Sequence, residues 1–119
     1  MITGTVTGNV GKKPELRTSA GGKVMANFSV ASTVKREGRE PQTTWVDVVA
    51  FDEQAERVVA DLDKGDRVVV SGRMALETYE KKNGEAGCTL RMIADEVGLS
   101  LRWGRKERAG AGDDYPVNF

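Results

Sequence analysis

Apolar residues recur at every second position along most of the chain, which is the period of a β-strand with one buried face. The clearest case is TTWVDVVAF, where aliphatic side chains alternate with aromatic or polar ones. Glycine-rich turn signals separate such runs, and residues 14–19 lead into a tight Gly21-Gly22 turn. An Asn83-Gly84 hairpin turn precedes the last run. The pattern predicts five strands, over residues 2–11, 24–33, 43–51, 67–80 and 87–101.

One segment changes period and predicts a helix, over residues 52–65. The spacing i, i+3, i+4, i+7 is that of one buried helix face. It is met by four apolar residues, Ala55, Val58, Val59 and Leu62. Asp52 is expected to cap the start of this helix, and Lys64-Gly65 to close its end.

The predicted order of elements is three strands, one helix and two strands. This order predicts an all-β fold, a five-stranded OB-fold barrel with the helix between strands 3 and 4. A five-stranded half-barrel of another topology is the alternative. We expect this domain to span residues 1–104, followed by a short flexible tail over residues 105–119, where small and charged residues dominate.

A small barrel places its β-branched side chains inside, which orients the strand at residues 43–51. Val46, Val48 and Ala50 are then internal, and the other side of the strand faces out. That side includes Trp45, which is hard to bury completely, and Phe51, whose exposure stays open because it adjoins the helix. The alternative is that both rings belong to the core. Phe28 shares a side with Val24 and Val30 and is expected in the core.

The chain is electrically neutral, with 18 Lys+Arg and 18 Asp+Glu, but its charge is unevenly distributed. Residues 1–45 hold seven Lys or Arg against three Glu, a net +4, and residues 67–108 hold nine against six, a net +3. Residues 46–66 hold two against seven, a net −5, and the last eleven residues add −2. A neutral chain of this kind can still present a positive face.

Neither the apolar runs nor the cysteine content points to a membrane or an extracellular protein. No run approaches the roughly 20 apolar residues of a membrane span, and the start lacks the apolar core of a signal peptide. The single Cys88 cannot form an internal disulfide and suits a reducing compartment. We expect a cytoplasmic, nucleoid-associated protein without a membrane partner.

Catalytic groups are scarce. The chain has no histidine, so neither a histidine base nor a histidine-ligated metal is available. Two carboxylate pairs lie at a helix end and in the tail, where nothing holds them in a catalytic geometry; they are Asp61 with Asp63 and Asp113 with Asp114. Phosphate-binding glycine motifs are absent as well. We expect no enzyme, no metal and no cofactor.

Aromatic residues lie among cations on the predicted strands. Trp45 and Phe51 share one side of a strand, and Tyr79 comes just before Lys81. Single-stranded nucleic acid binds by stacking bases on such rings while Lys and Arg contact phosphates, at about 1–3 kcal/mol per stacked base. The cations expected to contact phosphate are Lys12, Lys35, Arg36, Arg39 and Lys81. Alternatively, these cations are only solvated surface charges.

Two stretches resemble the bacterial and phage single-stranded-DNA-binding protein (SSB) family. They are VTGNVGKKPELRTSAGGKVMANFSVAST and TTWVDVVAFDEQAERVVADLDKGDRVVVSGRM, and the ending ADEVGLSLRW looks most like actinobacterial members. The similarity covers residues 2–103. Trp103, after the last strand, is expected to cap the barrel or an interface.

The resemblance implies sequence-independent binding of single-stranded DNA during replication, recombination and repair. It implies base stacking on Trp45, Phe51 and Tyr79, and basic contacts from Arg17 and Arg73. It also implies a homotetramer formed through the N-terminal strand, without catalysis or cofactor. The chain departs from the family at Arg36, where many members have an aromatic residue, at Asp47, which replaces an often basic residue, and in its very short linker before the tail.

The C-terminal residues suggest a docking tip for replication and repair proteins, as in SSB tails. The residues that match are Asp113, Asp114, Tyr115, Pro116 and Phe119, with Val117-Asn118 inserted before the end. A solvated terminus without a partner is the alternative. For the whole chain, the rival functions are an OB-fold primosomal accessory protein and a protein-interaction module that does not bind DNA.

Overall fold

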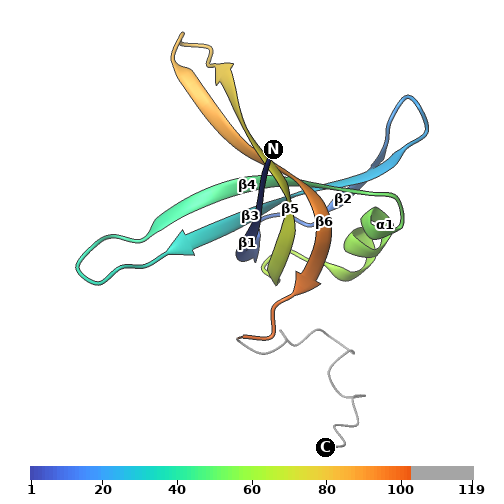
Figure 1. The fold of residues 1–119 in the computed structure, drawn as a ribbon, viewed down its shortest axis with the longest axis horizontal. Coiled ribbons are helices and arrows are strands. Elements are labelled where there is room, and N and C mark those ends of the chain that lie inside the picture. Colours follow the sequence, from blue (N-terminus) through green and yellow to red (C-terminus); the bar gives the residue numbers. More distant parts are fainter. Residues whose placement is uncertain (103–119) are drawn as a thin grey trace, which may run out of the picture.

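The computed structural model describes residues 1–102 (Figure 1). This part of the chain forms six strands and one helix. In chain order they are β1 (Ile2–Val10), β2 (Glu15–Thr18), β3 (Val24–Val34), β4 (Gln42–Phe51), α1 (Asp52–Asp61), β5 (Arg67–Glu80) and β6 (Ala86–Leu99).

The strands form one sheet in the order β1-β5-β6-β4-β3-β2, and the sheet closes on itself. The end of β1 pairs with β3 at Asn9–Ala31 and Val10–Val30. The β4–β6 pairing is parallel, whereas the other pairings are antiparallel. This closed arrangement is the predicted OB-fold barrel.

Residues 15–18 form a strand of their own, so the described strands number six rather than the predicted five. β4 pairs along one edge of β3, and β1 and β2 follow each other along the other edge. Val10 lies opposite Val30, and Glu15 lies opposite Asn27. The two short pairings therefore act as one interrupted barrel strand. Counted in this way, the helix lies between the third and fourth barrel strands, as predicted.

Two glycines allow the backbones to approach closely where the barrel curves. A Cβ at Gly8 would collide with the carbonyl oxygen of Ala31, and a Cβ at Gly72 with that of Ile93. The β5–β6 register shifts between Ser71 and Gly72, which marks a bulge.

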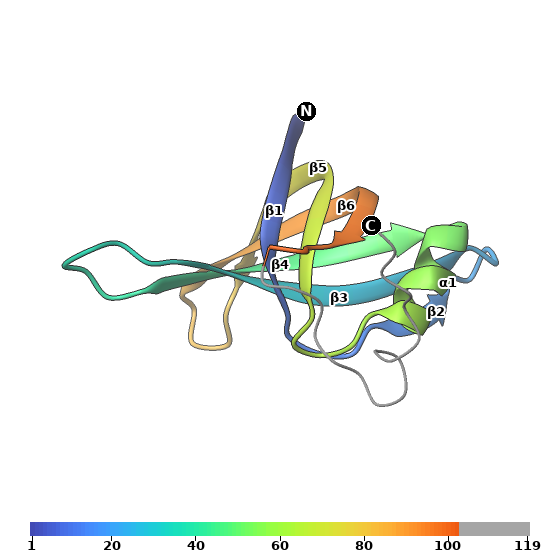
Figure 2. The ribbon, with the colours of Figure 1, turned by 90° about the horizontal axis from the view of Figure 1, so that it is seen from below.

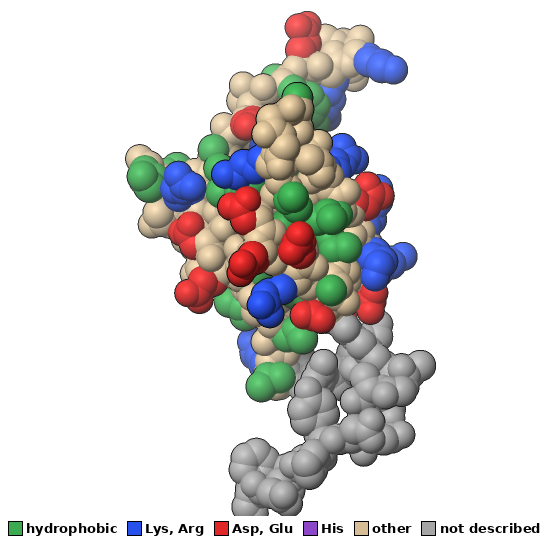
Figure 3. Space-filling model, turned by 90° about the vertical axis from the view of Figure 1, so that its right-hand side faces the viewer, with side chains coloured by type: hydrophobic (Ala, Val, Ile, Leu, Met, Phe, Trp, Pro, Cys, Tyr) green, Lys and Arg blue, Asp and Glu red, His purple; other side chains and the backbone are tan. Residues whose placement is uncertain are grey.

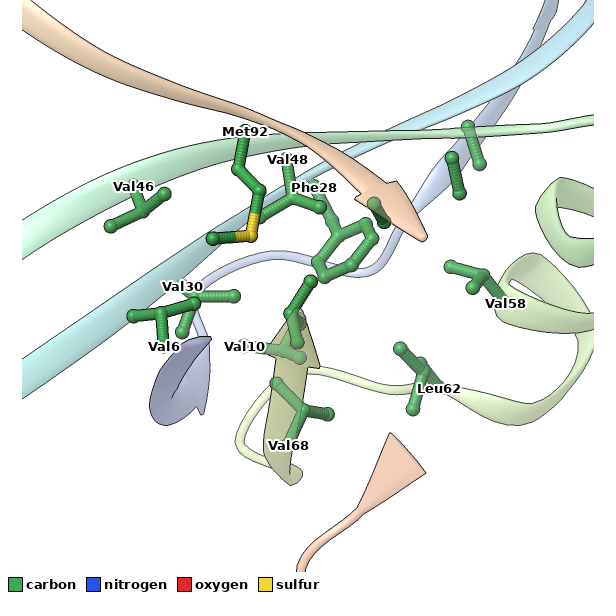
Figure 4. Close-up of a cluster of buried hydrophobic side chains, with 14 of the residues drawn as sticks. Val6, Val10, Phe28, Val30, Val46, Val48, Val58, Leu62, Val68 and Met92 are labelled. Carbon is green, nitrogen blue, oxygen red and sulfur yellow. The ribbon is translucent and has the colours of Figure 1, made fainter. Parts of the chain in front are cut away.

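The inward side chains of the strands form the core, which α1 covers at one end (Figure 4). Val46, Val48 and Ala50 are almost fully buried, and Phe28 packs among them, as predicted. The helix contributes its expected apolar face, with Ala55 and Val58 buried and Val59 partly buried, and Leu62, the residue just after the helix, is buried as well.

The helix begins at residue 52 as predicted, but the predicted caps at both of its ends are wrong. The N-cap is Phe51, without a side-chain capping hydrogen bond, and Asp52 is the first helical residue, with a φ of 58°. The helix ends at Asp61 because Leu62 turns to an extended conformation and buries its side chain. Gly65, with a φ of 90°, instead lies in the turn toward β5, where its N–H donates to the carbonyl of Val10.

The barrel has projecting hairpins and two unlike sides (Figures 1 and 2). The β3–β4 and β5–β6 hairpins extend away from the barrel. The side that α1 covers carries acidic side chains among apolar ones and some Lys and Arg (Figure 3). Asp52, Glu53 and Glu56 of α1 are exposed there. This charge makes the α1 side unsuited to an anionic ligand.

Candidate nucleic-acid interface

The outward side of β4 carries the predicted aromatic residues. Trp45 is 55% exposed, so it lies outside the core as expected. Asp47 is also exposed, and Val49 and Phe51 are half-buried. Since Val46, Val48 and Ala50 point inward, the strand separates core from surface with the period of two read from the sequence.

Strand pairing places this side of β4 within a continuous surface. Asp47 lies opposite Ser29 of β3 and Arg91 of β6, and Arg91 lies opposite Ala75 of β5. We call this surface the outer face. It consists of outward residues of β2, β3, β4, β6 and β5: Glu15, Arg17, Asn27, Ser29, Trp45, Asp47, Val49, Phe51, Arg73, Glu77, Tyr79, Arg91 and Ile93.

The indole of Trp45 lies over Gly11, in the break between β1 and β2. A Cβ at Gly11 would lie 2.5 Å from Cζ3 of Trp45 and 2.9 Å from Oγ of Ser29. The ring therefore occupies the space that a side chain at position 11 would take. This contact places Trp45 beside the segment that carries Lys12 and Lys13.

The ring of Tyr79 lies over a second glycine. Tyr79 is 49% exposed and pairs with Gly87 across the β5–β6 hairpin. A Cβ at Gly87 would lie 2.5 Å from Cζ of the ring. Both exposed rings on the outer face thus occupy space that a side chain in place of a neighbouring glycine would need.

Phe51 differs from the other two rings because a cation already lies over it. The Nζ of Lys23 is 5.0 Å from the ring centroid, a distance typical of a cation–π contact. Phe51 is also half-buried. The structure therefore places Phe51 on the outer face, with less of its ring free than Trp45 or Tyr79 has.

A hollow on the outer face collects basic side chains. Lys12, Lys13, Arg17 and Arg91 line it, together with Glu15, Asn27, Ser29, Asp47 and Val49. Trp45 borders it through Ser29. The hollow thus brings two of the predicted phosphate contacts, Lys12 and Arg17, close to the main aromatic residue.

Ion pairs hold three of the lysines and arginines of this region. Lys13 pairs with Asp63 at 3.0 Å, Arg17 with Glu15 at 3.5 Å, and Arg91 with Glu77 at 3.1 Å. In all three pairs the side chains are at least half exposed to solvent. Water and dissolved ions therefore reach every one of these cations.

The remaining predicted cations lie farther from the hollow. Arg36 and Arg39 line a separate hollow at the β3–β4 hairpin, with Val34, Glu40, Gln42 and Thr44. Lys35 lies in the same exposed loop. Arg73 lies on the outer face opposite Ile93, and Lys81 lies at the tip of the β5–β6 hairpin.

Sequence reasoning missed three cations, Lys13, Lys23 and Arg91. Arg91 alternates with the buried Met92, so the period of two already indicates that it faces outward. Its place beside Asp47 follows only from the parallel pairing of β4 with β6. Asp47, where many family members have a basic residue, therefore has an arginine as its neighbour in the β4–β6 register.

Metal sites and membrane-spanning helices can be assessed for the described residues. Within residues 1–102, no group of three or more His, Cys, Asp or Glu side chains is placed to hold a metal ion. No helix in that range is long and apolar enough to cross a membrane. The predictions for Trp103 and for the tail residues Asp113, Asp114, Tyr115, Pro116 and Phe119 concern positions outside the described part of the chain.

The model of the single-strand binding protein family matches residues 1–100. The chain belongs to this family. A relative named single-stranded DNA-binding protein, from Paenarthrobacter aurescens, is 37% identical over 92% of this chain and 72% of its own length. Another with that name, from Mycobacterium tuberculosis, is 36% identical over 83% of this chain and 64% of its own length.

A solved structure supports the same family assignment. The small single-stranded DNA-binding protein from Streptomyces coelicolor superposes with a TM-score of 0.75, at 29% sequence identity. The match covers 87% of this chain and 97% of that protein. The predicted family and the OB-fold are both confirmed.

Proposed function

We propose that this chain binds single-stranded DNA across its outer face without sequence preference. The observation that carries the proposal is the pair of exposed rings, Trp45 and Tyr79, on the same face as a hollow lined by lysines and arginines. The relatives of this chain are named for binding single-stranded DNA, and the proposal extends that property to it.

Two kinds of contact contribute to binding, namely base stacking and contacts to phosphate. Bases stack on Trp45 and Tyr79, and each stack contributes about 1–3 kcal/mol whatever the base, because every base has a π-face. Phosphates meet Lys12, Arg17 and Arg91 in and around the hollow. Binding then depends on the backbone and the ring faces of DNA rather than on base edges, so it does not select a sequence.

Other predicted contacts extend the path of the DNA. Arg73 lies on the outer face beside Ile93, and Phe51 adds a third, partly covered ring. Cations at the two hairpins continue the path beyond the barrel: Lys35, Arg36, Arg39 and Lys81.

The wider role that we propose is to coat and protect DNA strands exposed in replication, recombination and repair. The protein acts in the cytoplasm as a binder without catalysis. We further propose that the tail recruits replication and repair proteins through Asp113, Asp114, Tyr115, Pro116 and Phe119. The acidic charge of these tail residues favours a basic pocket on the partner and disfavours the DNA itself.

A homotetramer formed through β1 is also part of the proposal. Within the described residues, β1 pairs with β5 from Ile2 to Asn9, and its other edge pairs with β3 only at Asn9 and Val10. Much of that second edge therefore has unpaired backbone groups, and such an edge accepts another strand. Size-exclusion chromatography with light scattering measures the molar mass of the assembly and so tests whether four copies associate.

Fluorescence titration with oligo(dT) tests DNA binding directly. Trp103→Phe leaves Trp45 as the single tryptophan, so the signal reports on the outer face. We expect quenching that saturates at low salt and weakens as salt rises, because phosphate contacts release counterions. A signal unchanged by oligo(dT) at low salt would overturn the proposal and favour a protein-interaction module.

A further inference from the structure

We infer that Glu15, Asp63 and Glu77 act as built-in competitors of the DNA phosphates and so reduce the salt dependence of binding. The inference rests on the proposed DNA binding. Each of the three carboxylates lies within 3.5 Å of a cation that lines the hollow.

Arg91 shows the arrangement most clearly. Its Nε lies 3.1 Å from Oε2 of Glu77, and Asp47 is its neighbour in the β4–β6 register. Glu77 and Tyr79 project from the same side of β5, because they are two residues apart on one strand. A nucleotide stacked on Tyr79 thus lies close to the Glu77–Arg91 pair, and its phosphate reaches Arg91 by replacing Glu77.

The exchange of one anion for another changes the ion balance of binding. When a free cation meets single-stranded DNA, each phosphate contact releases condensed counterions and adds about −0.7 to the slope of log K against log salt. A paired cation behaves differently, because the displaced carboxylate takes up a cation from solution. This uptake partly offsets the release, so each exchanged pair contributes less to the slope.

The exchange also costs affinity, but only moderately. The side chains of the Glu77–Arg91 pair are 54% and 55% exposed, and solvent-exposed pairs of this kind are weak. Opening one pair is expected to reduce affinity by about 1.5-fold to fivefold. The competing carboxylates therefore weaken binding without preventing it. Affinity is lower at low salt, but it falls less steeply as salt rises.

The decisive variant is Glu77→Gln, with Glu56→Gln as its matched control. Both remove one negative charge, but Glu77 pairs with Arg91 of the hollow, whereas Glu56 is exposed on α1 and belongs to none of the three ion pairs described above. In the Trp103→Phe background, oligo(dT) affinity is measured over a series of salt concentrations. We expect Glu77→Gln to tighten binding by about 1.5-fold to fivefold at low salt and to steepen the slope by up to about 0.7. Glu56→Gln should leave the slope unchanged.

Adding Arg91→Gln separates the local effect from general electrostatics. In that background Glu77→Gln should no longer steepen the slope, because the cation that it freed is gone. Equal slopes for Glu77→Gln and Glu56→Gln would overturn this inference alone. Absence of binding by the parent protein at low salt would overturn both it and the proposed function. If Glu77→Gln fails to fold, Glu15→Gln makes the same test at Arg17.

Discussion

The residues on the two sides of β4 are constrained by different neighbours. On the inner side, Val46, Val48 and Ala50 are at most 1% exposed and contribute aliphatic volume to a closed core. On the outer side, Trp45 is 55% exposed and depends on one particular neighbour, Gly11. Stability and the proposed binding thus occupy alternate positions of one strand, so mutations should separate them.

The largest expected effect lies on the inner side of the barrel. Phe28→Ala removes a buried ring from the core and should lower the free energy of unfolding by about 3–5 kcal/mol. Urea denaturation followed by circular dichroism measures the loss. An unchanged denaturation midpoint would show that the inner side is not the source of stability.

The next effect lies on the outer side. Trp45→Ala should weaken oligo(dT) binding by about 1–3 kcal/mol through loss of one stacking ring. It should change the unfolding free energy by only about 0.5 kcal/mol, as exposed substitutions do. Fluorescence anisotropy of labelled oligo(dT) measures the affinity, and a denaturation curve measures the unfolding free energy. A large loss of unfolding free energy with unchanged oligo(dT) affinity would instead place Trp45 in the core.

A smaller effect tests the contact beneath the indole. Gly11→Ala keeps the ring but places a methyl group where Cζ3 of Trp45 now lies. The ring has to leave its preferred rotamer, at about 0.5–1.5 kcal/mol, and oligo(dT) binding should weaken by less than with Trp45→Ala. The same anisotropy assay measures it, with Gly21→Ala as control because a Cβ there contacts nothing. Equal affinities for the two variants would mean that Gly11 does not position Trp45.

The smallest effect concerns Phe51, which is half-buried and so lies between the buried inner residues of β4 and the exposed Trp45. Lys23→Gln removes the cation over its ring, and a contact at an exposed site of this kind contributes about 0.5–1 kcal/mol. We expect a loss of that size in the unfolding free energy, measured by thermal denaturation. Lys12→Gln, which removes an equal charge from an exposed position, serves as control. Equal melting temperatures would contradict the cation–π assignment.

Local patterns predicted most of the fold because they depend on neighbours along the chain. The period of two placed Val48 inside and Trp45 outside, and the helical spacing found the buried face with Ala55 and Val58. Asp52 was wrongly predicted as the N-cap, because the residue pattern at a helix start does not reveal that Asp52 is already helical and has a positive φ. Strand 15–18 was missed as a separate element because only its pairing with β3 defines it.

The candidate site was less predictable than the fold because it depends on contacts between distant segments. The rings and most of the cations proposed to contact phosphate were predicted from residue type. The position of Arg91 beside Asp47 requires the parallel β4–β6 register, which pairs residues about 44 apart. The glycines beneath Trp45 and Tyr79, and the ion pair of Lys13 with Asp63, are likewise invisible without the folded barrel.

The parallel β4–β6 pairing also has a consequence for biosynthesis. The outer face combines Arg17, near the beginning of the chain, with Arg91 and Ile93, near the end of the barrel. A nascent chain that has not yet produced β6 has the Trp45 ring but neither Arg91 nor a closed barrel. The surface proposed for DNA binding is therefore complete only once translation has passed residue 93, so we expect chains terminated before that residue to bind DNA more weakly than the full barrel.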